Sequence, residues 1–418
     1  MKVSDLKGKA VAMAVSGGLD SCTVTRWLTD HDVRVVCLTA DLGQPDEENV
    51  EDIKGRMLAC GAAEAVLVDA KDTIAEAGLE VVRAQARYEG GYWNTTGIAR
   101  HVTVQALLPE VRGRGIRAFG HGSTGRGNDQ VRFQLAPNML APEVEVYAPW
   151  RDPAFLAAFG GRKEMIDYCR RKGLPIRATH DKPYSTDANV LGLTHEAGLL
   201  ESLGTPALFI TPGMGVHPQQ APDRNEPFSV RFEEGVPVSI DGRGVSPLEA
   251  FRAANQAGGQ NGVGIGLHTV ENRFVGIKSR GVYEAPGMEL LGRCYEYLLQ
   301  LVLDRRARRL FNDASALLAE QIYQGYWFDP ASAAARGVIG HFARLATGTI
   351  SVVLYKGGVS FESAQDVPHS LYSESTASME RVGGFDHTDS EGFCRVLGVS
   401  ARALHAAGQV REKENPWT

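Results

Sequence analysis

Apolar runs and helix-spaced apolar residues alternate over the first third of the chain. The run Ala10 to Val15 ends at a pair of glycines, as a buried parallel strand does. Val24, Trp27 and Leu28 then follow at i, i+3 and i+4, which predicts one face of a helix. Three later apolar runs, at 33–38, 65–68 and 116–119, predict further strands. Apolar residues at 50, 53, 57 and 58 have helical spacing and predict a second helix.

This alternation with short links predicts right-handed βαβ units and a doubly wound parallel sheet. In such a sheet, ligands bind at the carboxyl ends of the strands. We therefore expect an α/β domain over residues 1–170.

The pattern changes beyond residue 170. Alternating residues in Phe228–Ile240 and in Thr349–Phe361 predict two hairpins, the first around Glu-Gly and the second around Gly357-Gly358. Pro247–Ala257 has the spacing of a short helix. This half predicts an α+β domain over residues 171–372.

A long helical pattern precedes the end of the chain. It covers Met288–Ile322, and polar residues near Phe311-Asn312-Asp313 predict a break in it. The sequence from about Gly384 is less regular, and we treat residues 373–418 as a separate C-terminal segment.

Composition and charge narrow the class of protein. The chain has 418 residues and a net charge of −6, which argues against a general nucleic-acid binder. No apolar run reaches membrane-spanning length, and the first residues carry no signal core. The six cysteines are scattered, so we expect reduced thiols in a cytoplasmic protein rather than a zinc site or disulfides.

A glycine-rich loop follows the first predicted strand. Ser16-Gly17-Gly18-Leu19-Asp20-Ser21 lies between that strand and the first helix. The two glycines let the backbone approach an anion, and the helix N-terminus directs free N–H groups at the same place. The loop lacks the Lys-Ser/Thr ending of a Walker motif. It is a phosphate cradle, or else a βα turn in which serine caps the helix.

A second polar segment comes after the strand that ends at Phe119. His121–Phe133 contains three glycines together with Thr124, Asn128, Asp129 and Arg132. An aspartate can bind an ammonium group, and an arginine can clamp a carboxylate with two parallel hydrogen bonds. These residue types could hold an amino acid by both charged groups. An ordinary capped helix start explains the Asn-Asp pair but not the glycines.

These two segments resemble known families. The Ser-Gly-Gly-x-Asp-Ser loop resembles that of the N-type ATP pyrophosphatases, and His121–Phe133 resembles the HGxTGKGNDQVRFE motif of argininosuccinate synthases. Six other segments resemble the same family: 40–44, 95–100 together with Tyr92, 182–189, 194–198, 270–273 and 278–284. The resemblance implies an adenine nucleotide alpha hydrolase-like α/β domain, an α+β synthetase domain and a C-terminal oligomerisation segment.

The resemblance also implies an activity. In this family the ureido oxygen of citrulline attacks the α-phosphorus of ATP, and the amine of aspartate then displaces AMP. No side-chain nucleophile is needed, so positioning and charge neutralisation carry the catalysis, with Mg²⁺ on the leaving pyrophosphate. We expect a cytoplasmic homotetramer without a resident metal, whose active site forms between the two domains.

Family roles carry over to matching positions. ATP binding falls to Ala14, Val15, Ser16, Gly17, Gly18, Leu19, Asp20, Ser21, Ala40 and Gly122. Aspartate binding falls to Thr96, Thr124, Asn128 and Asp129. Citrulline binding falls to Tyr92, Asn128, Arg132, Ser185, Thr194, Glu271 and Tyr283. The catalytic candidates are Asp20, Arg100 and Asp129.

Departures from the family pattern gather near the residues assigned to citrulline. Gly97 stands where the family has a serine, His101 replaces a proline, and Trp93-Asn94 replaces two apolar residues. His268 stands where an aspartate is expected. One alternative is a paralogue that joins aspartate to a different ureido, carbamoyl or carboxylate acceptor. Two others, a tRNA-modifying adenylase and a non-catalytic nucleotide sensor, fit the charge and the retained polar residues less well.

Overall fold

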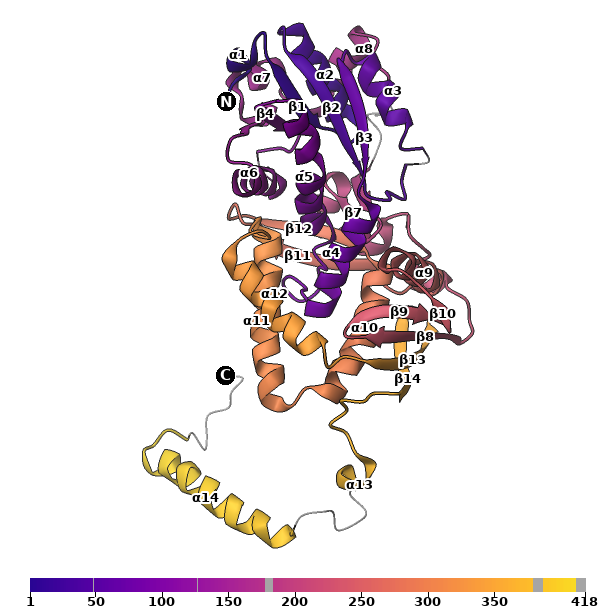
Figure 1. Ribbon diagram of the computed structural model, residues 1–418, viewed down its shortest axis with the longest axis vertical. Coiled ribbons are helices and arrows are strands. Elements are labelled where there is room, and N and C mark those ends of the chain that lie inside the picture. The colour runs from indigo at the N-terminus through magenta and orange to yellow at the C-terminus, as the bar shows by residue number, and fades with distance from the viewer. Residues whose placement is uncertain (48, 126, 177–182, 379–385, 411–418) are drawn as a thin grey trace. The chain divides into compact units, whose positions relative to one another are not determined.

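The computed structural model describes residues 1–47, 49–125, 127–176, 183–378 and 386–410. The chain divides into two compact units, residues 1–369 and 370–418. The first unit contains all three sheets (Figure 1).

A five-stranded parallel sheet forms the first part of the larger unit, as the strand–helix alternation predicted. Its strands are β1 (Ala10–Ala14), β2 (Arg34–Asp41), β3 (Glu64–Asp69), β4 (Ala118–His121) and β5 (Glu145–Tyr147). The order is β3-β2-β1-β4-β5, and all neighbours run parallel. The strands that follow β1 are therefore added first on one side, as β2 and β3, and later on the other side, as β4 and β5. The crevice at this reversal is where such sheets bind ligands.

Helices cover both faces of this sheet. They are α1 (Val3–Leu6), α2 (Leu19–Asp30), α3 (Asp52–Ala59), α4 (Lys71–Ala84), α5 (Thr95–Gly113), α6 (Asp129–Leu140), α7 (Pro153–Ala158) and α8 (Arg162–Arg171). Val11 and Met13 of β1 pack into one hydrophobic core with Trp27, whereas Ala12 between them packs into another. This period of two explains why β1 reads as an uninterrupted apolar run.

Two antiparallel sheets make up the second half of the larger unit. One has the order β11-β12-β7-β6, from β6 (Ser185–Asn189), β7 (Gly192–Glu196), β11 (Ile265–Asn272) and β12 (Lys278–Glu284). The other has the order β10-β9-β8-β13-β14, from β8 (Glu226–Glu233), β9 (Val236–Ile240), β10 (Arg243–Gly244), β13 (Gly348–Tyr355) and β14 (Gly358–Gln365). Both predicted hairpins are confirmed as β8–β9 and β13–β14, and α9 (Pro247–Gln260) confirms the short helix.

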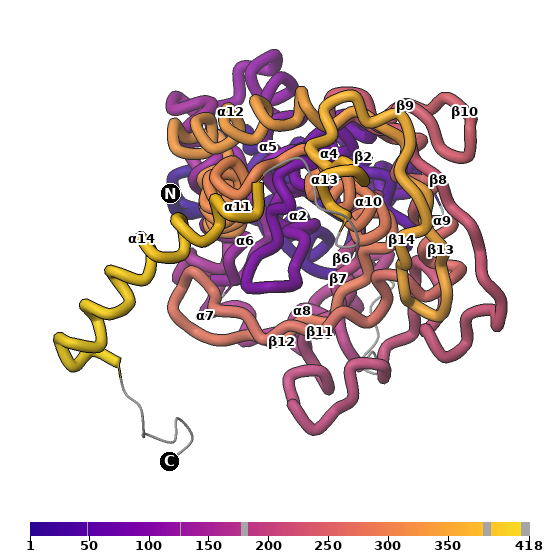
Figure 2. Tube along the Cα trace, turned by 90° about the horizontal axis from the view of Figure 1, so that it is seen from below, coloured from indigo at the N-terminus to yellow at the C-terminus, as the bar shows by residue number. Residues whose placement is uncertain are grey.

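The long helical pattern divides at a different place from the one predicted. The structure has α10 (Pro286–Val302) and α11 (Arg305–Gln324), so the predicted break at 311–313 is wrong. Asp304 caps α11 by accepting hydrogen bonds from the backbone N–H groups of Arg306 and Ala307. Phe311 is only 1% exposed, so its burial continues the apolar face through the polar residues that follow it. In Figure 2, α10 lies beside β13 and β14, with α11 and α12 (Pro330–Ala343) on its other side.

The smaller unit contains α13 (Glu374–Ala377) and α14 (His387–Ala406). The expectation of an irregular C-terminal segment is therefore wrong for the residues described, because α14 is a continuous helix of 20 residues. Asp386 caps it by accepting from the backbone N–H of Thr388. Cys394 on α14 is exposed, whereas the other five cysteines are buried, and all six are free thiols. Within the described residues, no helix is long and apolar enough to cross a membrane.

Candidate active site

A cavity of about 590 Å³ lies at the carboxyl ends of β1 and β4, where the strand order reverses. Ala14 and Val15 line it from the end of β1, and His121 and Gly122 from the end of β4. Residues of β6, β7, β11, β12 and α11 close it from the second half of the chain. The cavity therefore joins the parallel sheet to an antiparallel one.

The glycine-rich loop turns into this cavity. Gly17 has φ 74°, a conformation that disfavours other residues, and a Cβ there would lie 3.1 Å from Ile53. The guanidinium of Arg56 donates to the carbonyl of Gly17 at 2.9 Å, and this hydrogen bond holds the turn in place. The backbone N–H of Ser16 donates to the hydroxyl of Ser21 at 3.1 Å. These two hydrogen bonds hold the loop in a turn whose backbone can face an anion.

Asp20 of this loop has a specific neighbour that sequence reasoning missed. The indole N–H of Trp150 donates to Oδ1 of Asp20 at 3.1 Å. Burial raises the pKa of Asp20, and the Trp150 hydrogen bond partly opposes this. Among the described residues, Trp150 is the one side chain that donates to this carboxylate, and Oδ2 could meet a cation on a bound phosphate. Within the described residues, no group of His, Cys, Asp or Glu could by itself hold a metal ion.

An apolar part of the cavity lies at the carboxyl end of β2. Ala40 is 5% exposed and lines the cavity together with Leu38 and Leu42. Gln44 donates to the carbonyl of Ala40 at 3.0 Å and accepts from the N–H of Leu42 at 2.9 Å. This side chain therefore shapes the loop that borders the apolar surface.

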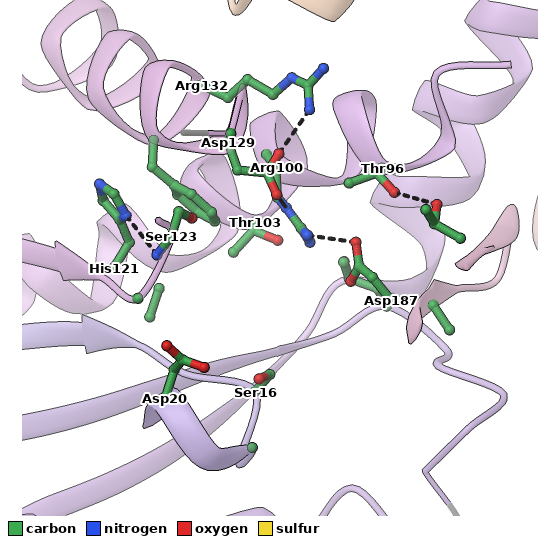
Figure 3. A pocket seen from close by; sticks show the side chains of 18 of the residues that line it. Ser16, Asp20, Thr96, Arg100, Thr103, His121, Ser123, Asp129, Arg132 and Asp187 are labelled. Carbon is green, nitrogen blue, oxygen red and sulfur yellow. Dashed lines mark hydrogen bonds and ion pairs between the residues drawn. The ribbon is translucent and has the colours of Figure 1, made fainter. Parts of the chain in front are cut away.

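Two arginines and two aspartates form a charged network on the opposite wall (Figure 3). Arg100 on α5 donates to Asp129 at 2.9 Å and to Asp187 at 2.5 Å. Arg132 on α6 donates to the other oxygen of Asp129 at 2.8 Å. Burial acts to raise the pKa of Asp129, but the two guanidinium groups outweigh it and lower the pKa to about 2. Asp129 is therefore an anion at any pH at which the protein would work.

Arg132 is held in place by a carbonyl of α11. Its Nε and Nη2 donate to the backbone oxygen of Tyr323 at 2.9 and 2.7 Å. The side chain is only 4% exposed. All three of its nitrogens are therefore oriented by protein groups, which pre-organises the guanidinium.

Aromatic rings and hydroxyls form the third wall. Tyr92 stacks on Tyr283 at 4.3 Å, and the hydroxyl of Tyr283 donates to Glu271 at 3.1 Å. Burial raises the pKa of Glu271, whereas the neighbouring tyrosine hydroxyls lower it. The hydroxyls of Thr96 and Thr194 lie 3.0 Å apart. This wall offers apolar surface and a few fixed polar atoms, as small-molecule sites do.

The structure brings nearly all the predicted site residues to one cavity. Those that line it are Ala14, Val15, Ser16, Gly18, Asp20, Ser21, Ala40, Tyr92, Thr96, Arg100, Gly122, Thr124, Asn128, Asp129, Arg132, Thr194, Glu271 and Tyr283. Gly17 and Leu19 do not, because Gly17 supplies the turn and Leu19 packs into the core. Ser185 is exposed, pairs with Glu196 across the strands β6 and β7, and lies outside the cavity lining.

Sequence reasoning missed other lining residues. These include Leu38, Leu42, Thr103, Asp187, Glu196, Arg273 and Tyr323. Asp187, Glu196 and Arg273 stand inside segments that matched the family, so their polar side chains gave a signal. Tyr323 gave none, since it ends an ordinary amphipathic helix.

The residues at 93–101 that depart from the family pattern do not line the cavity. Trp93, Asn94, Gly97 and His101 are absent from its lining. The indole N–H of Trp93 donates to Glu289 on α10 at 2.8 Å, and the amide of Asn94 donates to a carbonyl of α11 at 3.1 Å. His101 lies 3.2 Å from another carbonyl of α11, and a Cβ on Gly97 would meet that helix at 3.4 Å. These residues pack against α10 and α11, and none of them belongs to the cavity lining.

Comparison with known proteins gives consistent results over most of the chain. Residues 10–175 match the model of the arginosuccinate synthase N-terminal HUP domain, and residues 184–404 match that of the arginosuccinate synthase C-terminal domain. The argininosuccinate synthase of Rhodopirellula baltica is 42% identical over 396 residues, which cover 94% of this chain and 97% of that protein. The argininosuccinate synthase of Thermotoga maritima is 38% identical over 92% of this chain and 95% of that protein.

Similarity to solved structures is weaker. A U34-tRNA thiolase from Methanococcus maripaludis has 16% identity and a TM-score of 0.27, over 43% of this chain and 62% of that one. A 4-thiouridine synthetase bound to RNA and ATP has 17% identity and a TM-score of 0.28, over 40% of this chain and 41% of that one. Values this low carry no argument about the site.

Proposed function

The chain belongs to the argininosuccinate synthase family, and from this premise we propose that it joins citrulline to aspartate with cleavage of ATP to AMP and pyrophosphate. One observation carries the proposal. The glycine-rich loop at Ser16–Ser21 and the charged network around Asp129 line a single cavity. A nucleotide held by the first would therefore lie against an amino acid held by the second.

The nucleotide end of the cavity suits the first half of the reaction. The loop N–H groups and the start of α2 would hold the phosphates, with adenine against Ala40 and the backbone near Gly122. The ureido oxygen of citrulline attacks the α-phosphorus, an O–P bond forms, and the bond to pyrophosphate breaks. Mg²⁺ on the phosphates, with Asp20 as its protein ligand, would neutralise the departing charge.

The amino-acid end suits the two other substrates. Thr96, Thr124, Asn128 and Asp129 would hold aspartate, with Asp129 as the fixed anion for its ammonium group. Citrulline would lie against Tyr92, Asn128, Arg132, Thr194, Glu271 and Tyr283, and Ser185, which is exposed outside the cavity lining, would be a further contact. Arg100 links the two sets through Asp129 and Asp187. Electrostatic complementarity and orientation then account for the rate without a covalent enzyme intermediate.

The placement of the sequence departures supports citrulline as the acceptor. Gly97, His101 and Trp93-Asn94 contact α10 and α11, so they leave the cavity surface unchanged. Among the described residues that line the cavity, none favours a different ureido, carbamoyl or carboxylate acceptor.

We further propose a cytoplasmic homotetramer with a nucleotide-binding domain at 1–170, a synthetase domain at 171–372 and an oligomerisation segment at 373–418. Phe393, Val396 and Val399 on α14 are more than half exposed, and such an apolar surface favours cover by another subunit. The free thiols agree with a reducing compartment.

Product analysis tests the activity. The purified enzyme, ATP and Mg²⁺ are incubated with aspartate and citrulline together, with each alone, and with a panel of other ureido and carbamoyl compounds. We expect AMP and pyrophosphate in equal amounts with argininosuccinate, and the highest kcat/KM with citrulline. Formation of ADP and phosphate would contradict the proposal, and a higher kcat/KM with another acceptor would reassign the substrate.

A further inference from the structure

Aspartate cannot attack as an ammonium ion, so the second half of the reaction needs a group that accepts a proton. Carboxylates are the natural candidates in this cavity. Those that line it are Asp20, Asp46, Glu47, Asp129, Asp187, Glu196 and Glu271.

Most of these carboxylates are already engaged by protein groups. Asp129 and Asp187 form ion pairs with arginines. Glu47 pairs with Arg56 at 3.2 Å, and Glu271 accepts from the hydroxyl of Tyr283. Asp129 is a poor general base because its pKa is about 2. A carboxylate with so low a pKa binds a proton too weakly to take one from an amine at neutral pH.

Glu196 differs from them in its contacts. Among the residues described, none donates a hydrogen bond to its carboxylate, and its one ion pair is a long contact of 3.8 Å with Arg273. Half of the side chain, 50%, is exposed, and it belongs to the cavity lining. The carboxylate is therefore accessible to a substrate inside the cavity.

The backbone holds Glu196 at a sharp strand end. It is the last residue of β7, two positions after Thr194, so both side chains lie on the same face. The next residue, Ala197, has φ 66°, which costs an L-residue about 1 kcal/mol or more.

The surroundings make Glu196 more basic. Although half of the side chain is open to the cavity, the protein around it removes part of its hydration and raises its pKa; the negative charges of Asp129, Asp187 and Glu271 raise it further, whereas Arg273 lowers it. These groups stand on α6, β6, β11 and the turn after β11. A carboxylate with a raised pKa is better matched to proton transfer near neutral pH than an ordinary one.

We propose that Glu196 is the general base that takes a proton from the α-ammonium group of aspartate, an inference that rests on the proposed function. The neutral amine then attacks the activated ureido carbon, and a C–N bond forms. The C–O bond to AMP breaks, and its electron pair leaves on the AMP phosphate. Glu196 returns the proton to solvent through the open cavity.

The test separates the two half-reactions. Glu196→Gln is compared with wild type, with Glu196→Asp, and with Glu201→Gln, a matched change at an exposed glutamate outside the cavity lining. The first half-reaction is followed as exchange of labelled pyrophosphate into ATP with citrulline and no aspartate. The second is followed as aspartate-dependent formation of argininosuccinate.

For Glu196→Gln we expect exchange within about twofold of wild type and a kcat for argininosuccinate lower by about 100-fold. Glu196→Asp should recover part of the rate, and Glu201→Gln should match wild type. The acid limb of the kcat pH profile, present in wild type, should be absent in Glu196→Gln.

Three outcomes would overturn the assignment: equal loss in both half-reactions, an unchanged kcat, or a raised KM for aspartate alone. If wild type itself made no AMP and pyrophosphate, the proposed function would fail. Activity in wild type together with full activity in Glu196→Gln would overturn only the role of Glu196.

Discussion

Replacing Asp129 by Asn tests the charged network, because the change keeps the shape of the side chain and removes its charge. Arg100 and Arg132 each lose an ion pair, at 2.9 and 2.8 Å in the native protein. These pairs lower the pKa of Asp129 from its ordinary 3.8 to about 2 in spite of its burial. That difference corresponds to about 2 kcal/mol of folding free energy at neutral pH.

The pH dependence gives this prediction its sign. A depressed pKa stabilises the folded state above the unfolded value of 3.8, and the contribution disappears as the pH falls through about 2. About half of it should remain at pH 3. The variant should therefore melt about 2 °C below wild type at pH 7, and the gap should narrow on acidification.

Activity supplies the second readout. If Asp129 holds the ammonium group of aspartate, its loss should lower kcat/KM for aspartate by about 30-fold, the equivalent of about 2 kcal/mol. Steady-state kinetics with aspartate varied at saturating citrulline and ATP measures this. Equal melting temperatures at pH 7 together with an unchanged kcat/KM would refute the reasoning.

Three further substitutions test other parts of the account. Gly97→Ser should leave KM for citrulline unchanged within twofold, because a Cβ there meets α11 at 3.4 Å rather than the cavity; a clear fall in KM would place the residue in the site. Trp150→Phe removes the donor to Asp20, so the pKa of Asp20 should rise further, as followed by infrared titration of its carboxyl group in the enzyme without substrates. An unchanged pKa of Asp20 would contradict the effect assigned to this hydrogen bond. Gly192→Ala should destabilise the protein by about 1–3 kcal/mol in thermal melts, since its Cβ would lie 2.6 Å from the carbonyl of Glu284, and a wild-type melting temperature would contradict that close contact.

Short-range patterns were sufficient to predict the strands and the cradle. The runs that became β1 and β2 are apolar because both faces of those strands are buried, and the glycines after β1 mark the turn. The segment around Asn128 and Asp129 was predictable because it combines several glycines and polar residues, which an ordinary helix N-terminus does not require.

Long-range contacts explain what the sequence could not reveal. Tyr323 stands almost 200 residues from Arg132, and nothing in its helix indicates that its carbonyl holds that guanidinium. Trp150 lies 130 positions from Asp20. The substituted positions 93–101 lie in a family motif for substrate, yet Trp93 contacts α10 and His101 contacts α11. Only the fold decides which face of such a helix meets the ligand.

The central claim is that the ureido oxygen attacks the α-phosphorus of ATP in the cavity shared by the loop at Ser16–Ser21 and the network at Asp129. Citrulline labelled with ¹⁸O in the ureido group tests it directly, with mass spectrometry of the products after one turnover. The account predicts one ¹⁸O atom in AMP and none in pyrophosphate. Unlabelled AMP formed together with argininosuccinate would contradict it.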